Sequence, residues 1–130
     1  MLSSAFGDVI LCSHNFATVA LVERGGADHP ERWQGEVELG AHGGDLCIIF
    51  NLLDEPGGGP RLHRHPYTET FIIRRGTGRF TLGDQEIIAT EGQILIAPAN
   101  MPHKFTNVGP GPLETIDIHS SGKFRTEWLE

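Results

Sequence analysis

Short apolar runs alternate with turn-forming residues along most of the chain. Nine segments are rich in Ile, Val, Thr and Phe: residues 9–12, 16–23, 46–53, 70–75, 78–83, 85–90, 93–98, 103–108 and 113–119. Several of them alternate apolar with polar side chains, which is the period of a strand that buries one face. Turn signals such as EPGGGP, RRGTG and VGPGP separate the runs. The pattern predicts an all-β sandwich or barrel.

Two regions depart from this pattern. Residues 24–45 are polar and Gly-rich, and only Val37 and Leu39 indicate a brief strand, so we expect a loop region with one short pairing. The final residues, SGKFRTEWLE, predict a short C-terminal helical segment that docks Phe124, Trp128 and Leu129 onto the barrel. Since 130 residues is a single-domain length and no linker or repeat interrupts the chain, we expect one domain over residues 1–130.

Composition and charge narrow the classes of partner. The chain is 38% hydrophobic and 21% charged, as in ordinary globular proteins, and its formal net charge is −7. Nucleic acids and anionic membranes bind through basic patches, so we expect neither as a partner. The first residues have no basic region and polar residues interrupt their apolar run, which is unlike a signal peptide or a membrane span. We therefore expect a cytoplasmic protein.

The stretch LHRHPYTETF, residues 62–71, gathers metal-capable side chains. Residues two apart on a strand point to one side, so His63 and His65 can converge. A bend at Pro66 would turn the chain before Glu69 begins the next strand. Histidine and carboxylate ligands suit Fe, Mn, Ni, Cu or Zn, whereas Cys12 and Cys47 show no metal-binding spacing. An isolated HxH pair in a loop would instead be read as solvated.

The spacing of a longer set of residues strengthens the metal interpretation. The chain reads G(x)5HxH(x)3E(x)6G over residues 57–76 and, fifteen residues later, G(x)5PxN(x)2H(x)3N over residues 92–107. These segments resemble the two motifs of the cupin superfamily, and nine of the ten specified positions match, as in small single-domain cupins. The departure is Asn100, where the family usually has Gly. Asn tolerates the left-handed backbone region better than other non-Gly residues, so we expect the turn to survive.

The cupin resemblance implies a double-stranded β-helix, or jelly-roll, barrel with one divalent transition metal held by His63, His65, Glu69 and His103. It further implies a metal-dependent enzyme that acts on a small organic molecule, with a dioxygenase as the first choice. An isomerase, lyase or decarboxylase remains open. The alternative is a non-catalytic cupin that binds a metal or small ligand as a sensor, storage or accessory protein. Cupins are commonly dimeric, and outward apolar residues such as Ile72 agree with a homodimer.

A few further side chains are candidates for the site or its walls. Glu69 is expected to move a proton and Tyr67 to hydrogen-bond a substrate, so both are the catalytic candidates. His119 shares strand parity with Asp117, and the pair would face either the barrel mouth or solvent. The residues expected to line the barrel and make its cavity apolar are Phe71, Ile73, Ile94, Ile96 and Phe105.

Overall fold

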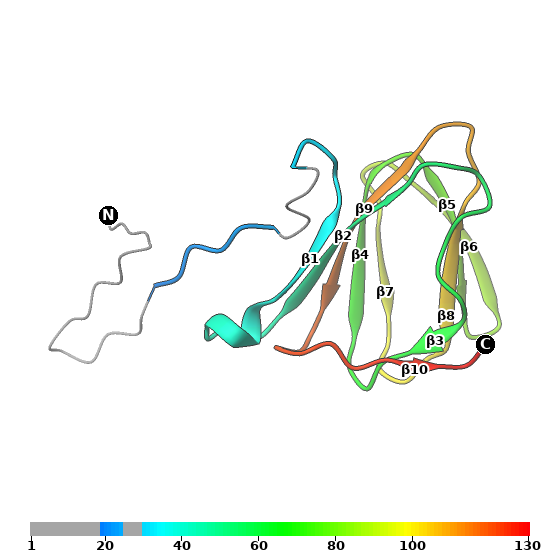
Figure 1. Ribbon diagram of the computed structural model, residues 1–130. Helices are drawn as coiled ribbons and strands as arrows, with labels where there is room; N and C mark the ends of the chain where they lie inside the picture. The colour runs from blue at the N-terminus through cyan, green and yellow to red at the C-terminus, as the bar shows by residue number, and fades with distance from the viewer. Residues whose placement is uncertain (1–18, 25–29) are drawn as a thin grey trace, which may run out of the picture.

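The computed structural model describes residues 19–24 and 30–130 and forms two β-sheets that face each other (Figure 1). The elements, in chain order, are β1 Gly35–Glu38, the 3-10 helix η1 Leu39–His42, β2 Cys47–Leu53, β3 His63–Arg64, β4 Glu69–Arg75, β5 Thr77–Leu82, β6 Gln85–Thr90, β7 Ile94–Ala97, β8 His103–Asn107, β9 Leu113–His119 and β10 Glu127–Trp128. Seven of them coincide, within about two residues at each end, with apolar runs read from the sequence. The all-β prediction is confirmed.

Each sheet has five strands, and all the pairings between them are antiparallel. The first sheet has the order β1-β2-β9-β4-β7 and the second the order β10-β3-β8-β5-β6. Strands that follow each other in the sequence therefore lie in different sheets at several points, as in a double-stranded β-helix. The two sheets enclose one interior, and every strand of the motif region sends alternate side chains into it.

The interior is apolar at one end of the barrel. Its buried cluster consists of Phe71, Ile73, Phe80, Leu82, Ala89, Ala97, Phe105 and Leu113. Three aromatic rings form its centre: the Phe80 ring lies 5.2 Å from that of Phe71 and 5.0 Å from that of Phe105. These pairs add edge and stacking contacts to the area that the rings bury.

Strand β7 presents the opposite face from the one expected. The side chains of Ile94 and Ile96 are 63% and 60% exposed, whereas Ala97 is fully buried and Leu95 packs against the core. The prediction that Ile94 and Ile96 line the barrel was therefore wrong, while Phe71, Ile73 and Phe105 do lie inside. All four residues of β7 are apolar, so the period of the pattern alone does not identify which face of the strand is buried.

The C-terminal segment is extended rather than helical. Strand β10 pairs with β3, with Trp128 opposite His63, and the red segment in Figure 1 runs across one end of both sheets. Glu127 and Glu130 make ion pairs with Arg64 and Lys104, which hold the segment flat against the barrel. The predicted C-terminal helix was wrong because cross-strand pairing outweighed a weak local helical pattern.

The predictions for the N-terminal part of the chain and for residues 24–45 had different outcomes. The predicted strand at residues 9–12 lies outside the described residues, as does the start of the run at 16–23, and residues 19–24 form no strand. Within 24–45 the expected short pairing is present, as β1 pairs with β2. No helix among the described residues is long and apolar enough to cross a membrane.

The motif glycines occupy turns that need left-handed backbone. The φ angles of Gly57, Gly76 and Gly92 are 87°, 89° and 85°, a region that glycine adopts without a Cβ penalty. Asn100, which stands where the family usually has Gly, has a φ of 66°. Its backbone N–H donates to the carbonyl of His65 at 2.7 Å, so this turn ties the second motif directly to the first. The expectation that Asn preserves the turn is confirmed.

Candidate metal centre

The four residues of the expected ligand set come together at one end of the barrel. His63 lies on β3, His65 just after it, Glu69 at the start of β4 and His103 at the start of β8, directly opposite His63. All four side chains are buried, and their candidate ligand atoms lie within 4.8 Å of one another. The chain turns between His65 and Glu69, as the sequence indicated at Pro66. The structure therefore holds a three-histidine, one-glutamate group suited to a metal ion.

Backbone carbonyls fix the protonation of the three histidines. The Nδ1 atoms of His63, His65 and His103 lie 2.6, 2.8 and 3.0 Å from the carbonyl oxygens of Arg61, Arg125 and Met101. A carbonyl only accepts hydrogen bonds, so each Nδ1 must carry the proton. In the neutral form of each ring, Nε2 then carries a free lone pair. Metal-binding histidines usually have this arrangement, in which one ring nitrogen binds the metal and the other donates a hydrogen bond that orients the ring.

The lone pairs meet a carboxylate rather than donors. Glu69 Oε1 lies 3.0 Å from Nε2 of both His65 and His103. The Nε2 atoms of His65 and His119 are fully buried and have no aligned hydrogen-bond partner, whereas Nε2 of His103 is in hydrogen-bond geometry with Glu69 Oε1. Neutral imidazoles would here direct lone pairs at a negative oxygen, which is unfavourable unless a positive charge lies between them. The donor set and these two buried nitrogens without an aligned hydrogen bond therefore fit a bound cation.

The pKa values of His63 and Glu69 are both shifted by their position in this buried cluster. Burial lowers the pKa of the His63 imidazole, which favours its neutral, ligating form. Burial alone would raise the pKa of the Glu69 carboxyl. The side chains of His103, His119 and His65 outweigh burial and hold the pKa of Glu69 well below its usual value, so it is a carboxylate.

Strand β9 contributes two buried polar residues that the sequence placed only at the mouth or in solvent. His119 is 2% exposed, and its Nε2 lies 3.1 Å from Glu69 Oε2. Asp117 is also buried and accepts a hydrogen bond from the Thr115 hydroxyl at 2.7 Å. Burial, together with the nearby charge of Glu69, raises the pKa of Asp117 well above its usual value. The strand parity of residues 117 and 119 was the signal that could have placed both inside.

Tyr67 lies beside the cluster but not on the wall of the cavity. Its ring stacks on His65, its hydroxyl lies 2.6 Å from His119 Nδ1, and the backbone N–H of Arg125 donates to its oxygen at 3.3 Å. The hydroxyl is thus engaged by protein groups. Its role as a catalytic residue stays a prediction, as does that of Glu69.

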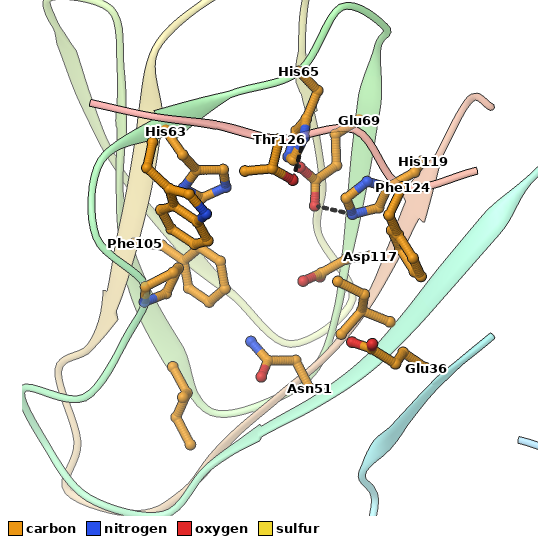
Figure 2. Close-up of a pocket in the computed structure, with 14 residues that line it drawn as sticks. Glu36, Asn51, His63, His65, Glu69, Phe105, Asp117, His119, Phe124 and Thr126 are labelled. Atoms are coloured by element: carbon orange, nitrogen blue, oxygen red, sulfur yellow. Dashed lines mark hydrogen bonds and ion pairs between the residues drawn. The ribbon is translucent and has the colours of Figure 1, made fainter. Parts of the chain in front are cut away.

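A cavity of about 430 Å³ opens beside the cluster, and Figure 2 shows labelled side chains around it. Apolar side chains form much of its wall, and no Lys or Arg is among the described residues that line it. The lining residues are Glu36, Ile49, Asn51, Leu53, Pro60, His63, His65, Glu69, Phe105, Asp117, His119, Phe124, Thr126 and Trp128. This volume suits one small molecule held next to the histidines.

Two facing antiparallel sheets around a buried three-histidine, one-glutamate cluster define the double-stranded β-helix class of protein. Comparison with protein families gives the narrower assignment. The family model described as "Cupin domain" matches residues 52–119, more than half of the chain, and the chain belongs to the cupin family. The match includes His63, His65, Glu69 and His103.

Similar proteins differ widely in length and name. A mannose-1-phosphate guanylyltransferase from Klebsiella pneumoniae is 33% identical over 73 residues, which cover 55% of this chain and only 16% of that enzyme. A structure of an uncharacterized protein with a double-stranded β-helix domain, from Klebsiella pneumoniae, is 23% identical, with a TM-score of 0.60 over 66% of this chain and 76% of that one. Bacillus subtilis oxalate decarboxylase, studied for its Mn(II) centres, is 20% identical, with a TM-score of 0.67 over 72% of this chain and 27% of that one. The two solved structures confirm the fold.

Proposed function

We propose that this protein binds one divalent transition metal through His63, His65, Glu69 and His103 and uses it to transform a small organic molecule held in the adjacent cavity. The observation that carries the proposal is the shared orientation of the three imidazoles. Each one donates from Nδ1 to a backbone carbonyl and leaves Nε2 directed at the cluster. Fe, Mn, Ni, Zn and Cu all suit this donor set, and the Mn(II) centres of the oxalate decarboxylase make Mn²⁺ one ion to test first.

A dioxygenase is the reaction type that we propose for the enzyme. A metal ion held by His63, His65, Glu69 and His103 would supply Lewis-acid or redox chemistry to the molecule beside it. The chain itself binds the molecule against an apolar wall that includes Ile49, Leu53 and Phe105, which excludes water. Glu69 would accept a proton at a carboxylate oxygen and return it later. Because no cationic side chain is among the lining residues, we propose a largely uncharged molecule as the substrate.

A second candidate is a non-catalytic metal- or ligand-binding cupin with an accessory role. One observation favours it: the guanylyltransferase that resembles this chain does so over only 16% of its own length. Dioxygen uptake separates the two candidates. Iron-loaded protein is offered catechols, flavonoids, thiols and diketones in an oxygen electrode. Consumption with one compound class supports the enzyme, whereas no consumption across the panel supports the accessory role.

Metal analysis tests the proposed site itself. Purified protein, supplied with metal and then desalted, should carry about one transition-metal ion per chain by elemental analysis. The double variant His63→Ala/His65→Ala should lose this metal while it retains the β-sheet circular dichroism spectrum. His42→Ala is the matched control, because this histidine is exposed on η1 and should leave the metal content unchanged. Full metal content in the double variant would show that the assigned ligands are wrong.

The homodimer is also a proposal. Its support lies on the outer face of the first sheet, where aliphatic and aromatic residues align across the strands in two rows. One row joins Val37, Ile48, Ile118 and Ile96, with Thr70 between the last two, and the other joins Phe50, Ile116, Ile72 and Ile94. A largely apolar sheet face of this kind is typical of interfaces. Light scattering that gives the mass of one chain at micromolar concentration would contradict the dimer.

A further inference from the structure

The inner face of the first sheet carries a second polar position beyond the proposed metal ligands. His119 pairs with Glu69, and Asp117 lies two residues before His119 on β9. Residues two apart on a strand are about 7 Å apart, so Asp117 lies that far along the wall from the row that holds Glu69. Asp117 is 3% exposed, lines the cavity and is not one of the four residues whose ligand atoms cluster.

The carboxyl group of Asp117 is held through one of its two oxygens. The Thr115 hydroxyl donates to Oδ1 at 2.7 Å, and no hydrogen bond to Oδ2 is recorded among residues 19–24 and 30–130. A buried polar atom without a hydrogen bond is unfavourable. Figure 2 shows the Asp117 side chain pointing into the cavity, so a molecule held there can hydrogen-bond to it.

The side chain of Asn51 lies beside Asp117 on the neighbouring strand. In the register of β2 and β9, Ile49 lies opposite Asp117. Asn51 is two residues further along β2, so it is the diagonal neighbour of Asp117 on the same face of the sheet. It is half-buried, lines the cavity and points into it in Figure 2. No hydrogen bond of its amide group is recorded within the described part of the chain, and an amide can both donate and accept.

Apolar side chains, including those of Leu53, Pro60 and Phe105, surround this polar pair on the wall of the cavity. Burial raises the pKa of the Asp117 carboxyl well above its usual value, which favours the neutral acid over a counter-charge for a cation. A hydroxyl group both donates and accepts, so it can pair with the carboxyl in either protonation state and with the amide of Asn51.

We propose that Asp117 and Asn51 form a subsite that binds a hydroxyl group of the substrate. The substrate is then an uncharged molecule with an apolar body, a metal-binding oxygen at one end and a hydroxyl at the other. This inference rests on the proposed function and adds to it the residues of the wall that select the substrate.

Two matched catechols test the subsite in the full-length protein loaded with Co²⁺. Both can bind a metal through their ring hydroxyls, and they differ only at ring position 4, where one carries a methyl group and the other a hydroxymethyl group. Each is titrated with air excluded, and the visible Co²⁺ bands report its binding. We expect the wild type to bind the hydroxymethyl compound about 3- to 10-fold more tightly, the effect of about one net hydrogen bond.

Variants of the two wall residues should reduce this ratio of affinities. Asp117→Leu and Asn51→Leu should each lower it, and the double variant should bind both catechols equally. Asp117→Asn, which keeps a group that donates and accepts, should retain part of the preference. A merely structural role would weaken both catechols together and leave their ratio unchanged. Gln85→Leu is the matched control, because it makes the same amide-to-leucine change at an exposed position on β6 and should keep the wild-type ratio.

Equal affinities of the two catechols for the wild type would overturn the subsite. The wild-type ratio in the double variant, or in Asn51→Leu if the double variant does not fold, would do the same. Unchanged Co²⁺ bands with both catechols would also overturn it, because no such ligand would then join the metal to this wall. Absence of Co²⁺ binding by the wild type would instead overturn the proposed function, so the two failures are distinguishable.

Discussion

The two ends of the barrel are built from the same strands, but one gathers most of the buried apolar side chains and the other gathers the buried histidines with Glu69 and Asp117. Strand β4 places Glu69 inside at one end and Phe71 and Ile73 farther along, while β9 proceeds from His119 and Asp117 to Leu113. At the core end, burial of apolar area favours folding directly. At the site end, burial is unfavourable for each polar group until a partner is found. We therefore expect the core end to supply most of the stability and the site end to depend on it.

The largest expected effect comes from a variant that leaves a cavity in the apolar core. Phe80→Ala removes a ring that is 1% exposed and packed between Phe71 and Phe105, and it should lower the free energy of unfolding by about 3–5 kcal/mol. Urea denaturation of the metal-free protein measures this loss. Metal affinity of the folded fraction should stay near that of the wild type, because no site residue is altered.

Two further variants serve as controls for the prediction on Phe80→Ala. Phe80→Leu keeps most of the volume and should cost only about 1 kcal/mol, so it remains measurable if the alanine variant does not fold. Ile88→Ala, at an exposed position on β6, should change stability by no more than about 0.5 kcal/mol. Equal losses in Phe80→Ala and Ile88→Ala would remove the distinction between core and surface on which the comparison depends.

The pH dependence of stability should arise at the site end. Burial lowers the pKa of His63 in the folded state, so the unfolded chain binds the proton more readily. The contribution of a neutral His63 is complete above a pH of about 6.5 and is lost below it, by at most about 1.4 kcal/mol per pH unit. The lowered pKa of Glu69 acts at more acidic pH, where its contribution is present above about 4.5 and is lost as the carboxylate is protonated.

Thermal unfolding of the metal-free protein between pH 8 and pH 4 measures this dependence. In His63→Asn the slope between pH 6.5 and pH 5 should be smaller than in the wild type, because one titrating group has been removed. Phe80→Leu should retain the wild-type slope while its whole curve lies lower. The same slope in His63→Asn and the wild type would place the acid sensitivity elsewhere in the molecule.

The smallest expected effect concerns the turn that joins the two motifs. Asn100→Ala keeps the backbone hydrogen bond to His65 but places a less tolerant residue at a φ of 66°, which should cost about 1 kcal/mol. Asn100→Gly should cost less, because glycine adopts this region freely. Chemical denaturation of both variants measures the difference. A glycine variant less stable than the alanine variant would show that the side chain, rather than the backbone angle, matters at this position.

Much of the molecule was predictable from local patterns. Strand positions followed from apolar runs between turn residues, and the ligand set followed from spacing, since His63 and His65 are two apart on extended chain and His103 starts another strand. Two further predictions failed for one physical reason. The buried face of β7 and the conformation of the C-terminal segment are both set by which strand lies alongside, so Ile96 points outward and Trp128 pairs across from His63. Local propensity is too weak to decide such alternatives.

The amino-acid sequence by itself determined the all-β architecture, the left-handed turns of the motifs and the four metal-capable side chains, because these depend on short-range periodicity and residue type. The carbonyls that accept from Nδ1 of His63 and His103 are also local, at Arg61 and Met101, two residues before each histidine. Only the tertiary structure decided how His65 and His119 are held. Nδ1 of His65 lies against the carbonyl of Arg125, 60 positions away, and Nδ1 of His119 lies against the hydroxyl of Tyr67, 52 positions away. These two contacts depend on the assembled fold, since no local pattern brings such distant groups together.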